Sequence, residues 1–199
     1  MIRFIILGHR AHTTADFKLE DICGGAGRLD ILTRCVNSAF FLSHDLRRDV
    51  QLYLVMMGGD DAPKTIRFDG SVMKYLNPDE RSTASLIRNA LLKKLEPDRE
   101  VISSPGVFVS RKSFEQLMDE LSGECRFVYL RENGEDVREY EFPENPCYIL
   151  GDDRDPTEEE EAIMAKYPYD TICLGPVSLH ANHCMILVHN EMDRRKAGE

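Results

Sequence analysis

The sequence has no long hydrophobic run. Its apolar stretches fall well short of the roughly 20 residues that a membrane-spanning helix needs. The apolar stretch near the N-terminus ends after Leu7, which is too short for the core of a signal peptide. We therefore expect a protein without a membrane segment that works in the cytoplasm, with a first β-strand at residues 2–7.

Paired cysteine motifs are also missing. The six cysteines are scattered along the chain, and no two of them form a C-x-x-C pair. In the absence of a secretory signal, this usage is typical of reduced thiols in a cytoplasmic protein.

Basic residues are fewer than acidic residues. The chain has 25 Lys and Arg residues against 35 Asp and Glu residues, and its net charge is −10. Non-specific binding to nucleic acid depends on neutralising phosphates with Lys and Arg, so the overall charge disfavours it. A local basic face is still possible, because affinity depends on where the charges lie.

The sequence does contain an alternation of strand and helix patterns. Its 199 residues suit a single domain, residues 1–199, and show no repeat or linker. The nearly continuous apolar run at 50–59 is typical of a strand buried on both faces of a parallel sheet. We predict an α/β fold with a mostly parallel sheet and helices on both faces. The expected strands are 2–7, 50–59, 65–68, 107–109, a pair joined by an Asn-Gly turn within 127–137, 147–151 and 171–175, and the expected helices lie within 24–46, 82–96, 113–121, 156–167 and 181–195.

Two of these helices have clear starting signals. Ser82, Thr83 or Ser85 can cap the second helix, and Pro97 ends it. Four successive glutamates follow Thr157, where negative charge complements a helix N-terminus. We interpret this acidic run as a solvated helix face rather than a metal site.

The C-terminal stretch 174–194 concentrates three histidines and a cysteine: His180, His183, Cys184 and His189. A metal site is one interpretation. Against it, His183 and Cys184 are adjacent on the predicted helix and point about 100° apart, and the second spaced pair that structural zinc usually needs is missing. A second interpretation makes Cys184 a nucleophile with a lowered pKa, although nothing identifies its substrate or an oxyanion hole.

A third interpretation joins this stretch to two other loops. Ligands of parallel α/β sheets bind outside the carboxyl ends of the strands, where this chain has Leu130, Gly151 and the segment 174–184. None of the three loops contains G-x-G-x-x-G or G-x-x-x-x-G-K-[ST], so a phosphate-bearing cofactor is poorly supported. A cofactor held by backbone amides and apolar side chains fits better.

Four stretches also carry a resemblance to a known family: LGPVSLHANHCMILVHNEMDR, ILGD, GGAGRLDILTRCVNSAFFLSHDLRRDV and LNPDERSTASLIRNAL. Together they resemble the archaeal tRNA pseudouridine N1-methyltransferases of the SPOUT class, over nearly the whole chain. The resemblance implies a SPOUT-type fold with a deep trefoil knot within about 125–199. It also implies S-adenosylmethionine bound in the knotted loops, and a homodimer with its active site near the subunit interface.

The resemblance assigns the cofactor to the same three loops. Backbone groups of Leu174, Gly175 and Leu179 are expected to read the adenine edge, and no metal is implied. The expected cofactor contacts are Leu130, Gly151, Leu174, Gly175, Pro176, Val177, Ser178, Leu179 and Cys184.

The expected RNA contacts lie upstream. Arg28 and Arg34 belong to a basic region of the sequence, and Asn77 and Arg81 belong to NPDER, which resembles the N-P-x-x-R segment of ribosomal-RNA pseudouridine methyltransferases. For each arginine, a structural salt bridge is the competing interpretation. Arg81 is the preferred RNA contact because it comes just before a predicted helix.

Two residues are candidates for catalysis. Pseudouridine N1 carries a proton, so a carboxylate that accepts it would help methyl transfer. Asp30 is preferred to Asp79 for this role, although Asp30 could equally orient a neighbouring arginine. Arg81 could stabilise charge that develops on the uracil carbonyls.

The resemblance implies that the function is S-adenosylmethionine-dependent methylation of N1 of pseudouridine 54 in the T-loop of tRNA. A SPOUT methyltransferase acting on ribosomal RNA is the alternative among enzymes of this fold. A non-catalytic RNA-binding or ribosome-assembly module of the same fold is an alternative of another class, and a metal-dependent hydrolase is a remote third.

Overall fold

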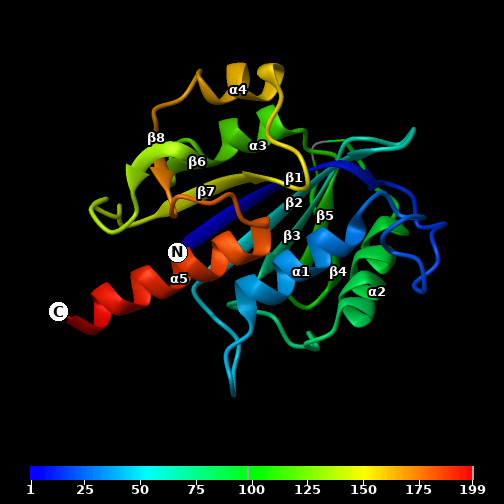
Figure 1. Ribbon diagram of the computed structural model, residues 1–199. Coiled ribbons are helices and arrows are strands. Elements are labelled where there is room, and N and C mark those ends of the chain that lie inside the picture. The colour runs from blue at the N-terminus through cyan, green and yellow to red at the C-terminus, as the bar shows by residue number, and fades with distance from the viewer. Residues whose placement is uncertain (98, 199) are drawn as a thin grey trace.

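The structure is a computed structural model that describes residues 1–97 and 99–198. Strands and helices alternate along much of the chain (Figure 1). The strands are β1 (Ile2–His12), β2 (Val50–Gly58), β3 (Lys64–Asp69), β4 (Val101–Ser104), β5 (Val107–Ser110), β6 (Arg126–Asp136), β7 (Pro146–Gly151) and β8 (Tyr169–Cys173). The helices are α1 (Leu29–Phe40), α2 (Glu80–Leu91), α3 (Phe114–Leu121), α4 (Glu158–Met164) and α5 (Ala181–Gly198).

All eight strands form one sheet in the order β4-β5-β3-β2-β1-β7-β6-β8. The half that contains β2, β1, β7, β6 and β8 is parallel throughout. The other half is antiparallel: β3 runs opposite to β2, β5 opposite to β3, and β4 opposite to β5. The prediction of a mostly parallel sheet is confirmed.

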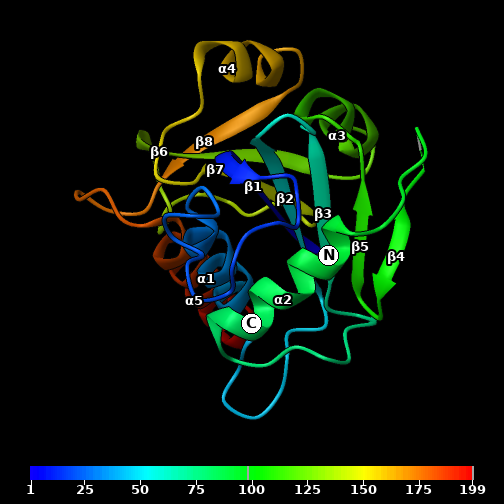
Figure 2. The same cartoon turned by 90° about the vertical axis from the view of Figure 1, so that its right-hand side faces the viewer.

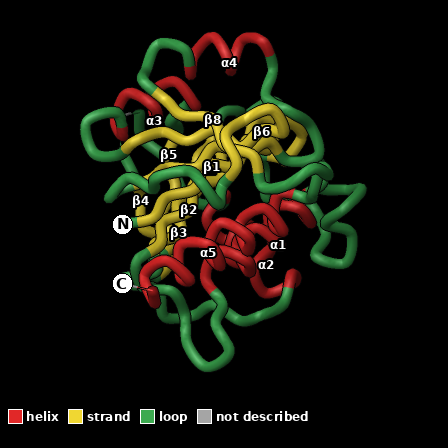
Figure 3. The backbone as a smooth tube through the Cα atoms, turned by 60° about the vertical axis from the view of Figure 1, so that its left-hand side comes forward, coloured by secondary structure: helices red, strands yellow, loops and turns green. Residues whose placement is uncertain are grey.

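Helices cover both faces of the sheet, as predicted. Helices α1, α2 and α5 form one layer, and α3 and α4 form the other (Figures 2 and 3). Successive residues of β1 point to opposite faces, so Phe4 and Ile6 pack in the core beneath α1 and α5 while Ile5 and Leu7 pack beneath α3 and α4. Because both faces are covered, the strand has to be apolar at every one of these positions.

The predicted start of the second helix is wrong by a few residues. Helix α2 begins at Glu80, and its N-cap is Asp79, not Ser82, Thr83 or Ser85. Asp79 has an extended backbone, so its carboxylate folds back and accepts a hydrogen bond from the Ser82 amide at 2.7 Å. The helix also ends at Leu91, before Pro97.

The predicted Asn-Gly turn does not produce a hairpin. Strand β6 continues past it, with Leu130 and Glu135 both placed opposite Ile172 of β8 and the residues between them looped out. Strand β4 was not expected at all. Its four side chains are only partly buried or exposed, so its sequence lacks the apolar pattern of a strand.

Candidate functional site

A pocket of about 650 Å³ lies at the ends of β7 and β8, beside the point after Leu130 where the regular pairing of β6 with β8 is interrupted. These three strands are parallel, so their carboxyl ends meet at one edge of the sheet, where α/β proteins bind ligands. Three segments far apart in the sequence line the pocket: residues 129–132, residues 150–156 and residues from Leu174 to Cys184.

The pocket contains most of the residues predicted to contact a cofactor. Leu130 comes from the first segment, Gly151 from the second, and the others from the third: Leu174, Gly175, Val177, Ser178, Leu179 and Cys184. Pro176 is not among the described residues that line the pocket. The structure thus brings the three predicted loops together, while the contacts themselves stay predictions.

Glycine is required at two positions of the pocket wall. A Cβ at Gly151 would lie 1.8 Å from the carbonyl oxygen of Arg154, so the loop could not fold back on itself there. Gly175 has a φ of 143°, in a region that side chains other than glycine rarely adopt. Nothing lies within 4 Å of the Cβ position at Gly175, so the backbone there is open, whereas Gly151 allows the Arg154 backbone to pack against it.

Cys184 lies in the wall as a neutral thiol. Burial raises its pKa to about 11, and its sulfur lies 3.8 Å from the carbonyl oxygen of Leu179. A thiolate nucleophile needs a lowered pKa, so this environment disfavours the interpretation of Cys184 as a nucleophile.

The three C-terminal histidines occupy two different environments. His180 and His183 line the pocket, with their rings edge to face at 5.6 Å. His189 is buried against Phe4 at 5.1 Å, and burial lowers its pKa to about 4. Within residues 1–97 and 99–198, no three His, Cys, Asp or Glu side chains are grouped so that they could hold a metal ion.

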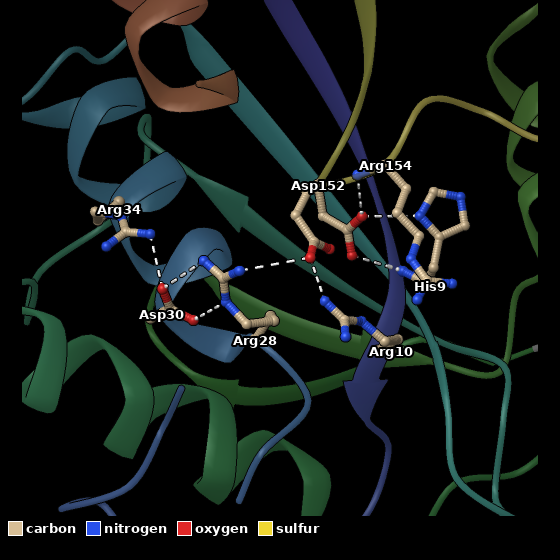
Figure 4. Close-up of polar contacts among 8 residues, drawn as sticks. His9, Arg10, Arg28, Asp30, Arg34, Asp152 and Arg154 are labelled. Carbon is tan, nitrogen blue, oxygen red and sulfur yellow. Dashed lines mark hydrogen bonds and ion pairs between the residues drawn. The ribbon is translucent and has the colours of Figure 1, made fainter. Parts of the chain in front are cut away.

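A buried polar cluster supports the second segment of the pocket. His9, near the end of β1, lies with Nδ1 2.9 Å from Oδ1 of Asp152 (Figure 4). Its Nε2 lies 3.0 Å from Oε2 of Glu160. Hydrogen bonds to these two carboxylates raise the pKa of His9 to about 9. The sequence analysis did not single out this cluster.

Beside it, a row of alternating charges runs from the pocket toward α1. Asp153, which lines the pocket, pairs with Arg10 and with Nη1 of Arg28 at 3.4 Å. Asp30 then accepts hydrogen bonds from Nε of Arg28 at 3.0 Å and from Nη2 of Arg34 at 2.7 Å (Figure 4). Two of the predicted RNA-contacting arginines and the predicted catalytic carboxylate therefore form one cluster.

Asp30 stays ionised in this cluster. Its burial opposes ionisation, but the hydrogen bonds and charges of Arg28 and Arg34 outweigh that effect and hold its pKa below the ordinary value. A carboxylate with a lowered pKa is a weaker proton acceptor. The geometry therefore fits the alternative role for Asp30, in which it orients the two arginines.

Arg81 and Asn77 lie apart from this cluster. Arg81 is on the first turn of α2 and pairs with Glu20 at 2.9 Å, with both side chains largely exposed. Neither Arg81 nor Asn77 is among the described residues that line the pocket. The structure places neither of them in the pocket wall, although Glu80, the residue before Arg81, lies 4.0 Å from Nη1 of Arg34.

Comparison with known proteins places the chain in a family. The family model described as "Putative SAM-dependent RNA methyltransferase" matches residues 1–197. The chain belongs to this family.

Relatives in this family of RNA methyltransferases match over their full length. The tRNA (pseudouridine(54)-N(1))-methyltransferase of Methanococcoides burtonii is 49% identical, with 100% of this chain and 99% of that protein covered. The protein of the same name from Haloferax volcanii is 50% identical, with 97% and 96% covered. That from Methanocaldococcus jannaschii is 42% identical, with 100% of both chains covered.

Two solved structures of other proteins share this fold. Archaeoglobus fulgidus Nep1 bound to S-adenosylhomocysteine aligns with a TM-score of 0.66 and 13% identity, covering 98% of both chains. The SpoU methyltransferase AviRb from Streptomyces viridochromogenes aligns with a TM-score of 0.53 and 14% identity, covering all of this chain and 61% of that one. In the described part of the chain, no helix is both long and apolar enough to cross a membrane.

Proposed function

We propose that this chain methylates N1 of pseudouridine 54 in the T-loop of tRNA, with S-adenosylmethionine as the methyl donor, in the cytoplasm. The observation that carries the proposal is the 42–50% identity, over essentially the whole chain, to proteins that bear the name of this activity. The pocket at the ends of β7 and β8 supports it, because it assembles the loops that the sequence assigned to the cofactor.

The lining of the pocket fits S-adenosylmethionine chemically. Gly175 leaves backbone near the pocket uncovered, as recognition of an adenine edge by main-chain groups requires. Glu132 and Asp155 add negative charge to the lining, which suits the positive sulfonium and ammonium groups of the cofactor. When bound, the cofactor supplies an electrophilic methyl group. In this proposal Leu130, Gly151, Cys184 and the segment 174–179, including Pro176, hold it.

The basic side of the row of charges is proposed to meet the RNA. Arg10, Arg28 and Arg34 converge on Asp153 and Asp30 beside the pocket, and Arg34 also lies 4.0 Å from Glu80, so three guanidinium groups gather on this side of an acidic protein. A tRNA phosphate placed there would be bound by guanidinium groups whose directions Asp30 already fixes. Asn77 and Arg81 are proposed as further contacts, away from the pocket.

These residues act on the reaction by positioning. Methyl transfer to a ring nitrogen requires an in-line approach and the exclusion of water, and both depend on fixed loops around the target base. Pseudouridine would leave its stack to enter the pocket, which is easier in a loop than in a duplex. Arg81 is proposed to stabilise the charge that develops on the uracil carbonyls during methyl transfer. This role requires that the RNA or a partner subunit brings the target base near α2.

We propose that the working form is a homodimer. Val177, Leu179, Ile186 and Leu187 expose apolar surface beside the pocket, on the third loop and on the outer side of α5. Contiguous exposed apolar side chains are typical of protein interfaces. A second subunit on this surface would adjoin the pocket and limit the access of water to it.

We also propose that residues 1–199 form one domain whose segment 125–199 contains a deep trefoil knot. One sheet that includes all eight strands supports the single domain. Within this segment, β7, β6 and β8 are parallel neighbours in the sheet, and the three loops that would form the knotted cofactor site line one pocket.

Mass spectrometry of RNA tests the proposed function. A T-arm stem-loop that carries pseudouridine is incubated with the protein and S-adenosylmethionine, and the same RNA with uridine is the control. We expect a gain of one methyl group on pseudouridine only. An unchanged pseudouridine, with S-adenosylhomocysteine bound in calorimetry, would favour a module without this activity.

A further inference from the structure

The second segment of the pocket wall depends on a histidine that does not line the pocket itself. Residues 150–156 run from the last two residues of β7 toward α4, and after Gly151 they form no helix or strand. Asp152 stands at the start of this connection, and Glu160 lies in the first turn of α4 beyond its end. His9 of β1 contacts both carboxylates, so it ties the two ends of the wall to the centre of the sheet.

The contacts are complete on both sides of the ring. Asp152 has a fully buried side chain that accepts hydrogen bonds from the His9 amide at 2.9 Å, from the His9 ring at 2.9 Å and from the Arg154 amide at 3.2 Å. Oε2 of Glu160 accepts from the amide and the hydroxyl of Thr157 as well as from His9. Glu160 is therefore at once the third helical residue of the capping box of α4, whose N-cap is Thr157, and the partner of His9.

The arrangement suits a positively charged ring. A neutral imidazole donates from one nitrogen only, so its other nitrogen would turn a lone pair toward a carboxylate. The imidazolium donates a hydrogen bond from each nitrogen. Its positive charge also balances part of the negative charge of the two carboxylates, which are shielded from water. The neighbouring Asp153 is paired with Arg10 and Arg28, so it does not compete for this proton.

We propose that His9 is a positioning residue for cofactor binding, which as an imidazolium clamps Asp152 to Glu160 and so fixes the wall formed by residues 151–156. The inference rests on the proposed function, since it takes S-adenosylmethionine as the ligand of the pocket. His9 does not line the pocket among the described residues, so it acts through the loop and not by contact with the ligand.

Two substitutions test the clamp from outside the pocket. His9→Gln removes the charge and one of the two ring contacts, and Glu160→Gln weakens the clamp at a residue that does not line the pocket either. Glu159→Gln is the matched control, because it makes the same change at the exposed neighbouring position of the same helix turn. Circular dichroism and urea unfolding confirm that each variant is folded.

Calorimetry with S-adenosylhomocysteine gives the first measurement. We expect both clamp variants to bind it about tenfold more weakly, a change of about 1.4 kcal/mol, and Glu159→Gln to bind like the wild type. In methylation assays the KM for S-adenosylmethionine rises, while kcat at saturating cofactor and the KM for tRNA stay within about twofold. Equal binding by wild type and clamp variants, or an equal loss in Glu159→Gln, overturns the assignment of His9.

A pH series on the wild-type protein needs no substitution. The pKa of His9 is raised to about 9, so the clamp is intact at neutral pH and opens as the pH passes through that value. The affinity for S-adenosylhomocysteine should fall between pH 8 and 10 more steeply in the wild type than in His9→Gln. Identical pH profiles contradict the clamp. Failure of the wild type to bind at neutral pH instead contradicts the proposed function.

Discussion

Asp30 lies between two guanidinium groups at the N-terminal end of α1, and its side chain is almost fully buried. Replacing it by Asn keeps the shape but removes the charge that Arg28 and Arg34 share. Hydrogen bonds between charged groups contribute about 1.5–3 kcal/mol each, so both arginines lose a strong orienting contact. We expect Asp30→Asn to lower kcat/KM for tRNA roughly tenfold, about 1.4 kcal/mol, in steady-state methylation assays.

The same variant separates orientation from cofactor binding. Asp30 is not one of the described residues that line the pocket, so the affinity for S-adenosylhomocysteine should not change. Asp16→Asn provides a control, because Asp16 is exposed and bonds to Thr14 instead of an arginine. If Asp30→Asn left tRNA kinetics as unchanged as Asp16→Asn does, the proposed orienting role of Asp30 would be wrong.

Single residues also show why part of the site escaped prediction. Gly151 ends one predicted strand, and Cys184 follows another in the sequence. Since ligands bind beyond the carboxyl ends of parallel strands, the sequence alone could place both residues in the pocket. The partners of His9 lie 143 and 151 positions away from it. Its charge and its contacts arise only when β1, β7 and α4 come together in the fold. No pattern of neighbouring residues in the sequence predicts these contacts.

At the level of helices, the cap of α2 gives a direct test of where the helix begins. Asp79 accepts the hydrogen bond of the Ser82 amide, whereas Ser85 lies within the helix. Loss of an N-cap side chain leaves an amide of the first turn without a partner. We expect Asp79→Ala to lower the melting temperature by roughly 2–4 °C, and Ser85→Ala to leave it almost unchanged. Equal effects of both changes would place the helix start elsewhere.

At the level of strands, burial was predictable and direction was not. The apolar runs at residues 2–7 and 50–59 correspond to β1 and β2, the central parallel pair. The pattern of Thr65 to Phe68 also predicted β3, but an apolar pattern reads the same in both chain directions. Whether a strand runs parallel depends on the connection before it, and the short loop between β2 and β3 permits only an antiparallel return.

For the whole molecule, two buried histidines predict opposite slopes of stability with pH. His9 has a raised pKa of about 9, so the folded protein holds a proton that the unfolded chain releases above about 6.5. Its contribution to the free energy of unfolding is complete below pH 6.5 and is lost as the pH rises toward 9. His189 has a lowered pKa of about 4, so stability is lost as the pH falls from 6.5 toward 4.

Urea unfolding at a series of pH values measures both slopes. Stability should be greatest near pH 6.5, His9→Gln should flatten the alkaline side, and His189→Phe should flatten the side between pH 6.5 and 4.5. The depressed carboxylates contribute mainly below their ordinary pKa of about 4, so this acidic window reports on His189. His44→Gln is an exposed control that should leave both slopes in place. A flat alkaline side in the wild type would contradict the charged state of His9.

The assembly of two chains gives the last prediction. Ile186 and Leu187 are exposed on α5 within one turn of His183 and Cys184, which line the pocket together with the exposed Val177 and Leu179, so a partner that covers α5 here would also border the cofactor. Replacing Ile186 and Leu187 by Glu puts charge on this surface, and burial of unpaired charge in an interface is strongly unfavourable. Sedimentation velocity should show a dimer for the wild type and a monomer for the double variant.

Methylation should fall with the loss of the dimer, because the pocket mouth would then stay open to water. Leu92→Glu is the matched control, since Leu92 is equally apolar and is 70% exposed at the end of α2, outside the pocket lining. It should remain dimeric and active. A double variant that still sediments as a dimer would move the interface to another surface. A monomer that methylates at the wild-type rate would instead show that one chain holds the whole site.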